Sequence, residues 1–163
     1  MTTEKSKDVD VIVSDAVDVV DEATRANTGD VAAAIVAMNT PGNSAIYSSI
    51  VGDSFEARKS IVNAMTTSEP IDEHLGEVIR LANYVIQAVT LLDDEGQSNV
   101  APRVILIDED GTAYHGTSVG LFSSLQNLSA ILGEPATWPE AVEIAVAREK
   151  TRKGFQVFTI RLV

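Results

Sequence analysis

Apolar and β-branched residues dominate the chain from about residue 76 onward, and their pattern predicts strands. Residues 76–93 form an almost continuous run of this kind, which indicates one long, curved strand. A polar loop over residues 93–102 leads into two further strands, 103–107 and 112–118. Asp110 and Gly111 stand between these two strands and are typical of a tight hairpin turn.

The remaining segments predict one helix and a second hairpin. Residues 119–133 have apolar residues three and four positions apart, and Gly133 and Pro135 end this helical pattern. Apolar residues then alternate over 142–146 and 158–162, on either side of a turn at 150–154. The apolar face of the helix consists of Leu121, Leu125, Leu128, Ile131 and Leu132.

Three strands, a helix and two strands follow one another in the order of the five-stranded Greek-key OB-fold barrel. We therefore predict a mainly β fold with some helix, of the order β-β-β-α-β-β. A short helix should precede the barrel, begin at Asp53 or Ser54 and end before Glu69 and Pro70. The face of this short helix is expected to carry Phe55, Ile61, Val62 and Met65.

Composition divides the chain near residue 45. Residues 1–45 carry eight acidic and three basic side chains without a clean period, and they predict an acidic, partly disordered extension. Residues 46–163 are the predicted OB-fold domain with its N-terminal helix. The chain has no Cys, no signal-peptide pattern and no long apolar stretch, so we expect a soluble cytoplasmic protein without a membrane partner.

Charge is distributed unevenly along the chain. The net charge of −12 argues against a protein that coats duplex DNA with its whole surface. Residues 77–140 carry two basic and nine acidic side chains, whereas residues 141–163 carry five basic side chains against two acidic ones. The five basic residues are Arg148, Lys150, Arg152, Lys153 and Arg161.

In an OB fold, the loop between the last two strands flanks the ligand-binding face. Here that loop is the basic segment 150–154, so the fold and the charge together predict a clamp for single-stranded nucleic acid. Charged residues that merely protect an edge strand are the alternative explanation.

Base stacking also needs outward aromatic side chains, and the chain has few. Tyr84, Tyr114 and Phe155 are the candidates, with core packing as the alternative for each. Arg80 and Arg103 lie in strands expected to line the binding surface, although ordinary ion pairs would also explain them. By pattern, the residues predicted to be buried are Phe122, Phe158 and Trp138.

No arrangement of residues predicts catalysis. The chain has two His and no Cys, shows no zinc-site spacing and contains no Gly-rich phosphate loop. We therefore expect no enzyme, no cofactor and no metal.

Five segments carry a resemblance to a known family. They are IYSSI (46–50), EARKSIVNAM (56–65), HLGEVI (74–79), LIDEDGTAYHGTSVGLFSSLQNL (106–128) and EKTRKGFQVFTIRLV (149–163). Together they resemble single-stranded-DNA-binding proteins encoded by phages and mobile elements of Gram-positive bacteria. The resemblance implies binding of single-stranded DNA without sequence specificity, in phage or plasmid DNA replication in the host cytoplasm. Replication proteins and further copies of the chain are the partners that it suggests.

One departure from bacterial replication proteins of this type concerns the acidic segment. Those proteins carry an acidic partner-binding tail at the C-terminus, whereas here the acidic segment is N-terminal, so we do not carry that tail over. The acidic arm either occupies the basic groove until DNA displaces it or keeps the protein soluble. The alternative function is an OB-like protein-interaction or virion structural module without nucleic acid binding. The sequence leaves open the preference for DNA or RNA, the size of the binding site and the oligomeric state.

Overall fold

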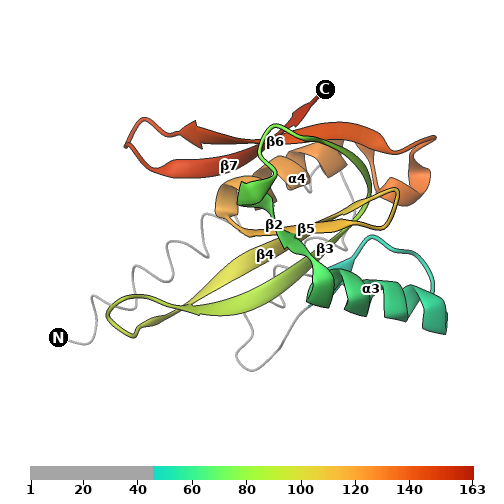
Figure 1. The fold of residues 1–163 in the computed structure, drawn as a ribbon, viewed down its shortest axis with the longest axis horizontal. Coiled ribbons are helices and arrows are strands. Elements are labelled where there is room, and N and C mark those ends of the chain that lie inside the picture. Colours follow the sequence, from blue (N-terminus) through green and yellow to red (C-terminus); the bar gives the residue numbers. More distant parts are fainter. Residues whose placement is uncertain (1–45) are drawn as a thin grey trace.

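The computed structural model describes residues 46–163, which form a strongly curled β-sheet with one helix on each of its faces (Figure 1). The helices are α3 (Phe55–Thr67) and α4 (Val119–Leu132). The strands are β1 (Ile46–Ser48), β2 (Glu69–Pro70), β3 (Val78–Leu92), β4 (Ser98–Asp108), β5 (Ala113–Thr117), β6 (Val142–Lys150) and β7 (Gln156–Leu162). The predicted order of three strands, a helix and two strands is present as β3, β4, β5, α4, β6 and β7. The prediction of a mainly β fold with some helix is therefore confirmed, and the curled sheet is consistent with an OB-like fold. The short strands β1 and β2 were not predicted.

Strand β3 is the centre of the sheet, whose main path has the order β2-β5-β4-β3-β6-β7. Its first residues pair with β6, and further along the same edge it pairs with β1 instead. The register of β3 against β4 shifts between Leu81 and Asn83. Because an extra residue of this kind increases the local twist, the strand bends there and the sheet curls around α4.

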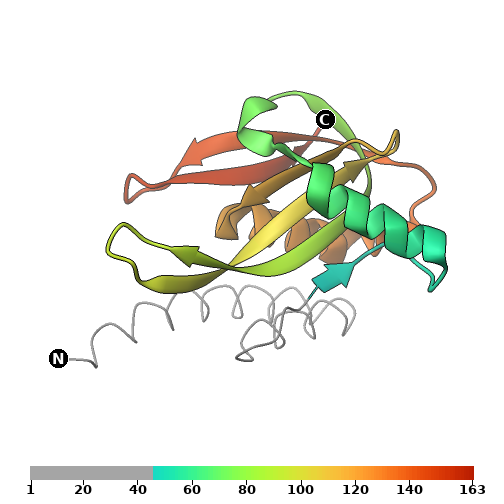
Figure 2. The ribbon, with the colours of Figure 1, turned by 60° about the horizontal axis from the view of Figure 1, so that its bottom comes forward.

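The sheet does not close into a complete barrel. In the part of the chain that the structure describes, β5 pairs with β4 and β2, and β7 pairs with β6, but β5 and β7 do not pair with each other. The first turn of α4 lies at this opening. Two hairpins, β3–β4 and β6–β7, project from the same side of the sheet (Figures 1 and 2).

Two turns confirm predictions, and one strand is longer than predicted. The Gly111 amide donates to the Asp108 carbonyl at 2.9 Å in the β4–β5 turn. Gly154, with φ of 86°, occupies the turn between β6 and β7, where a left-handed conformation favours glycine. The prediction of a loop over residues 93–102 was wrong for its second half, because β4 begins at Ser98. Continued pairing with β3 out to Leu92 outweighs the polar composition of this stretch.

Helix α4 packs against the inner face of the sheet. The Ser118 hydroxyl accepts from the Leu121 amide at 3.3 Å at its start, and Gly133 follows its end, as predicted. Its buried side chains contact the core formed by β3, β4 and β6. The core face includes Leu121, Phe122, Leu125 and Leu128. Ile131 and Leu132 were wrongly placed on this face, and both are exposed. Ile131 is 82% exposed, because it lies roughly 180° around the helix from the buried Phe122.

Helix α3 covers part of the outer face of the sheet. The Ser54 hydroxyl accepts from the Ala57 amide at 3.1 Å, which confirms the predicted start. Two small residues, Ala57 and Ala64, are buried against the sheet. The prediction that Phe55 and Val62 share this face was wrong, and both are exposed. They lie roughly 140–160° around the helix from Ala57, so they point toward solvent. The acidic extension predicted at 1–45 lies outside the described residues.

Candidate nucleic-acid interface

The opening of the sheet forms a groove between the start of α4 and strand β7, which we call the seam. It encloses a cavity of about 470 Å³. Gly120 makes the close approach of helix and strand feasible, since a Cβ atom there would lie 2.7 Å from the Phe158 carbonyl oxygen. The seam is lined by Thr117, Ser118, Val119, Gly120, Arg148, Gln156, Val157 and Phe158.

Arg148 stands over the seam because of strand alternation. In β6, Ile144 and Val146 are buried in the core, and Arg148 has the same parity two residues further on. Its guanidinium carbon lies 5.4 Å from the centroid of the Phe158 ring, a cation–π distance. Phe158 was predicted to be buried, but it is half-buried and forms one wall of the seam.

The basic turn, residues 150–155, extends beyond the seam. It is held in shape by two bonds between Thr151 and Phe155: the Thr151 amide donates to the Phe155 carbonyl at 2.8 Å, and the Phe155 amide donates to the Thr151 hydroxyl at 3.1 Å. Phe155 is 68% exposed, and Arg152 and Lys153 are exposed beside it. Within residues 46–163 none of the cations Arg148, Lys150, Arg152 and Lys153 forms an ion pair. This end of the molecule therefore carries uncompensated positive charge.

The other hairpin on this side of the sheet, β3–β4, differs in charge from the β6–β7 hairpin. Its tip carries Asp93, Asp94 and Glu95, all exposed. Arg103 lies nearer its base, half-buried, and donates to the Ser68 hydroxyl at 3.2 Å. Positive charge is thus concentrated on the β6–β7 side.

Tyr84 was a candidate stacking platform, and the structure corrects this. The side chain is fully buried in the core, and its hydroxyl donates to Glu134 at 2.9 Å and lies 3.1 Å from the Ser129 hydroxyl. Burial raises the pKa of the Tyr84 hydroxyl. A base cannot stack on a ring that is covered on both faces, so Tyr84 is a core residue.

Tyr114 also lies away from the basic turn. Its ring is half-buried and meets the His74 ring edge-on, with centroids 4.8 Å apart. Burial, assisted by nearby carboxylates such as Asp108 and Asp110, raises the pKa of the Tyr114 hydroxyl. These negative charges would repel a phosphate backbone.

Two further candidate residues are neutralised by carboxylates. Arg80 pairs with Glu109, and also with Glu143 at 3.8 Å. Arg161 pairs with Glu149 and lowers the pKa of that carboxyl through a hydrogen bond. For Arg80 the alternative of an ordinary ion pair therefore applies. Arg161, which was predicted as part of the basic cluster, is ion-paired as well.

The structure thus brings together Arg148, Lys150, Arg152, Lys153 and Phe155 on one hairpin. Arg103 is not among them, because its side chain points to the α3 face of the sheet, with Ile105 and Ile107, and bonds Ser68 there. The seam wall at residues 117–120 was not predicted from the sequence, since nothing in that segment signals its approach to β7. The parity of Arg148 with Ile144 and Val146 would have placed Arg148 over the core opening.

A comparison with protein-family models adds an independent finding. Residues 40–163 match the model described as phage single-stranded DNA-binding protein, of the phi29 type. Neither the search of curated proteins nor the search of solved structures gave a match. Among residues 46–163, no helix is long and apolar enough to cross a membrane.

The family match decides between the two functions that the sequence left open. The match covers three quarters of the chain and includes every strand of the curled sheet. The interaction or virion module without nucleic acid binding finds no support. The chain belongs to the family of phage single-stranded DNA-binding proteins, which are not enzymes, and it binds single-stranded DNA in phage replication.

Proposed function

We propose that one DNA strand follows the seam and the basic turn, with its phosphates facing Arg148, Lys150, Arg152 and Lys153 and a base stacked on Phe155. The single observation that carries this proposal is a continuous row of four cations that form no ion pair within residues 46–163. Arg148 lines the seam, and Lys150, Arg152 and Lys153 follow it in the basic turn. Arg103 is left out of this surface, because its side chain points to the α3 face of the sheet. Four other candidates are left out of this surface as well: the ion-paired Arg80 and Arg161, the buried Tyr84 and the half-buried Tyr114.

The charge distribution supports a path along the β6–β7 hairpin. Cations without carboxylate partners gain most from phosphate contacts, since no existing ion pair has to be broken. The acidic tip of the β3–β4 hairpin, at Asp93, Asp94 and Glu95, would keep the backbone on the basic side.

The seam favours a single strand over a duplex. Bases of a single strand are free to stack on Phe155 and to enter a cavity of about 470 Å³. Paired bases are stacked inside the helix and would present only phosphates. Because phosphate contacts and stacking tolerate every base, binding would be independent of sequence.

The wider biological setting is also proposed, from the sequence resemblance alone. It includes a Gram-positive host, action in the host cytoplasm and contacts with other replication proteins.

Fluorescence anisotropy with labelled oligo-dT, its RNA equivalent and a duplex, at two salt concentrations, would test the site. Arg152→Glu/Lys153→Glu should lose most of the affinity for oligo-dT. The matched control is Arg58→Glu/Lys59→Glu, which makes the same change in charge on the exposed side of α3. Equal losses in both variants would point to a general charge effect and contradict the assignment to the basic turn.

A further inference from the structure

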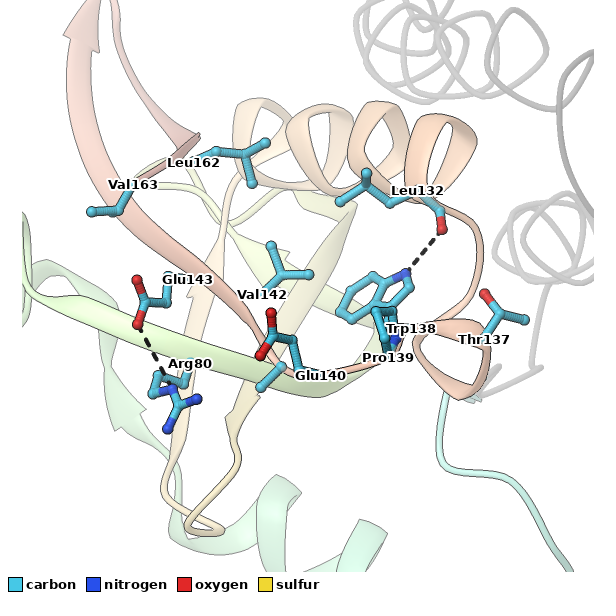
Figure 3. Close-up of a pocket in the computed structure, with 11 residues that line it drawn as sticks. Arg80, Leu132, Thr137, Trp138, Pro139, Glu140, Val142, Glu143, Leu162 and Val163 are labelled. Carbon is cyan, nitrogen blue, oxygen red and sulfur yellow. Dashed lines mark hydrogen bonds and ion pairs between the residues drawn. The ribbon is translucent and has the colours of Figure 1, made fainter.

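A second cavity, of about 560 Å³, lies at the end of the β6–β7 hairpin remote from the basic turn (Figure 3). Trp138 forms a wall of this cavity and is held in place because its indole N–H donates to the Leu132 carbonyl at 3.1 Å and to the Gly133 carbonyl at 2.9 Å. The volume falls in the range of roughly 300–1,000 Å³ that holds small ligands, so an aromatic side chain would fit. The apolar side chains that line it are Leu132, Trp138, Pro139, Ala141, Val142, Leu162 and Val163.

The carboxylates at this cavity make it a poor site for a phosphate backbone. Glu140 and Glu143 stand at its edge (Figure 3). Glu143 pairs with Arg80, whereas Glu140 forms no ion pair among residues 46–163. An apolar cavity beside an unpaired carboxylate suits a protein segment with an aromatic side chain next to a cation.

The basic turn of the same chain has these properties. Phe155 is 68% exposed, and Arg152 and Lys153 beside it are unpaired within the described residues. The turn cannot reach the cavity of its own molecule. The two lie at opposite ends of β6, whose nine residues span roughly 26 Å.

We propose that the cavity at Trp138 receives Phe155 from a second copy of the chain, with Arg152 and Lys153 of that copy facing Glu140. The contact joins two different surfaces, so each added copy leaves one turn and one cavity free and association continues head to tail. This inference goes beyond the proposed function but uses the same surface, because the turn that docks is also the turn proposed to bind DNA. A single strand and a second copy would therefore compete for it.

Sedimentation velocity of the full chain at rising concentration tests the contact. One aromatic anchor with two ion pairs is a small interface, for which we expect a Kd on the order of 0.1–1 mM. The average mass should rise toward about 1 mM protein and fall again when an oligo-dT of about 10 nucleotides is added. A mass that stays constant up to about 1 mM would overturn the proposal.

A charge exchange makes the test specific. Glu140→Lys alone and Arg152→Glu/Lys153→Glu alone should each abolish self-association, since turn and cavity then carry the same sign of charge. An equimolar mixture of the two variants should associate again, because each turn then meets a cavity of opposite charge. Association that survives Glu140→Lys, or a mixture that stays monomeric, would refute the contact.

Measurements of DNA binding distinguish a failure of this inference from a failure of the proposed function. Glu140→Lys should bind oligo-dT as tightly as the unmodified chain, because it leaves the basic turn intact. If Arg152→Glu/Lys153→Glu kept its affinity for oligo-dT while the charge exchange succeeded, the DNA site would be wrong and the contact between copies would stand. The single tryptophan of the chain, Trp138, gives a second readout, since its fluorescence should change as the cavity fills.

Discussion

Arg148 lies opposite Phe158 across the β6–β7 pair, and its guanidinium carbon is 5.4 Å from the centre of the phenylalanine ring. The ring holds the cation over the seam without neutralising it. We therefore expect Arg148→Gln to weaken oligo-dT binding and to lower the slope of log K against log salt by about 0.7, the value for one phosphate contact of a single strand. Anisotropy titrations across a salt series measure both quantities. Arg148→Lys should keep the slope, since it keeps the charge; an unaltered slope in Arg148→Gln would exclude a phosphate contact.

Removal of the exposed ring in the basic turn should affect binding and not folding. Phe155→Ala is expected to cost about 1–3 kcal/mol of oligo-dT affinity, the contribution of one stacked base. The control is Phe55→Ala on α3, because that ring is even more exposed, at 78%. Affinities should be compared by anisotropy and folding by circular dichroism. Equal affinity of Phe155→Ala and the unmodified chain would contradict stacking on this ring.

The buried hydroxyl of Tyr84 should contribute to stability alone. Tyr84→Phe removes its bonds to Glu134 and Ser129 and should lower the free energy of unfolding by about 1 kcal/mol. Urea denaturation measures this loss. Affinity for oligo-dT should remain at the unmodified level, and a clear loss of affinity in a folded variant would return Tyr84 to the binding surface.

Gly120 should be essential for the packing of α4 against β7. A methyl group at this position would lie 2.7 Å from the Phe158 carbonyl oxygen, so Gly120→Ala forces helix and strand apart. We expect a loss of about 1–3 kcal/mol in the free energy of unfolding, the usual cost of overpacking. Asn127→Ala, at an exposed position of the same helix, is the control and should change little. Similar stabilities of the two variants in urea would show that the seam adjusts freely.

His74 should make stability depend on pH. Its ring bonds Glu77 at 3.0 Å and Glu69 at 2.8 Å, and the hydrogen bond to Glu77 is the main cause that raises the pKa of His74 above its usual 6.5. The stabilisation that protonated His74 gives to the folded state is complete below pH 6.5. It is lost as the pH rises through the higher pKa that His74 has in the folded state. Urea midpoints of the unmodified chain should therefore fall more steeply above pH 6.5 than those of His74→Gln. Parallel profiles of the two proteins would argue against this role.

The order of the strands could be predicted because each strand carries its own pattern of apolar residues. The orientation of Tyr84 could not. Ile79 and Leu81 point into the core, and the register shift before Asn83 reverses the alternation, so that Tyr84 and Ile86 also point inward. A bulge of this kind depends on the neighbouring strands and leaves no mark in an apolar run.

The charged cluster was found from sequence because all its members lie within one hairpin. Which of the candidate cations form ion pairs could not be predicted. The partners of Arg80, for example, lie 29 and 63 positions further along the chain, at Glu109 and Glu143. Likewise, the exposure of Phe55 follows from the close packing of the small residues of α3 on the sheet, which hydrophobicity alone does not reveal.

The two hairpins that project from one side of the sheet end in opposite charges, with acidic residues at 93–95 and basic residues at 150–153. Their separation gives that side of the molecule an electric dipole. A polyanion that approaches by diffusion would turn this dipole before any contact forms, so most encounters would begin in one orientation. The rate of association should then fall steeply with ionic strength, while the rate of dissociation responds less.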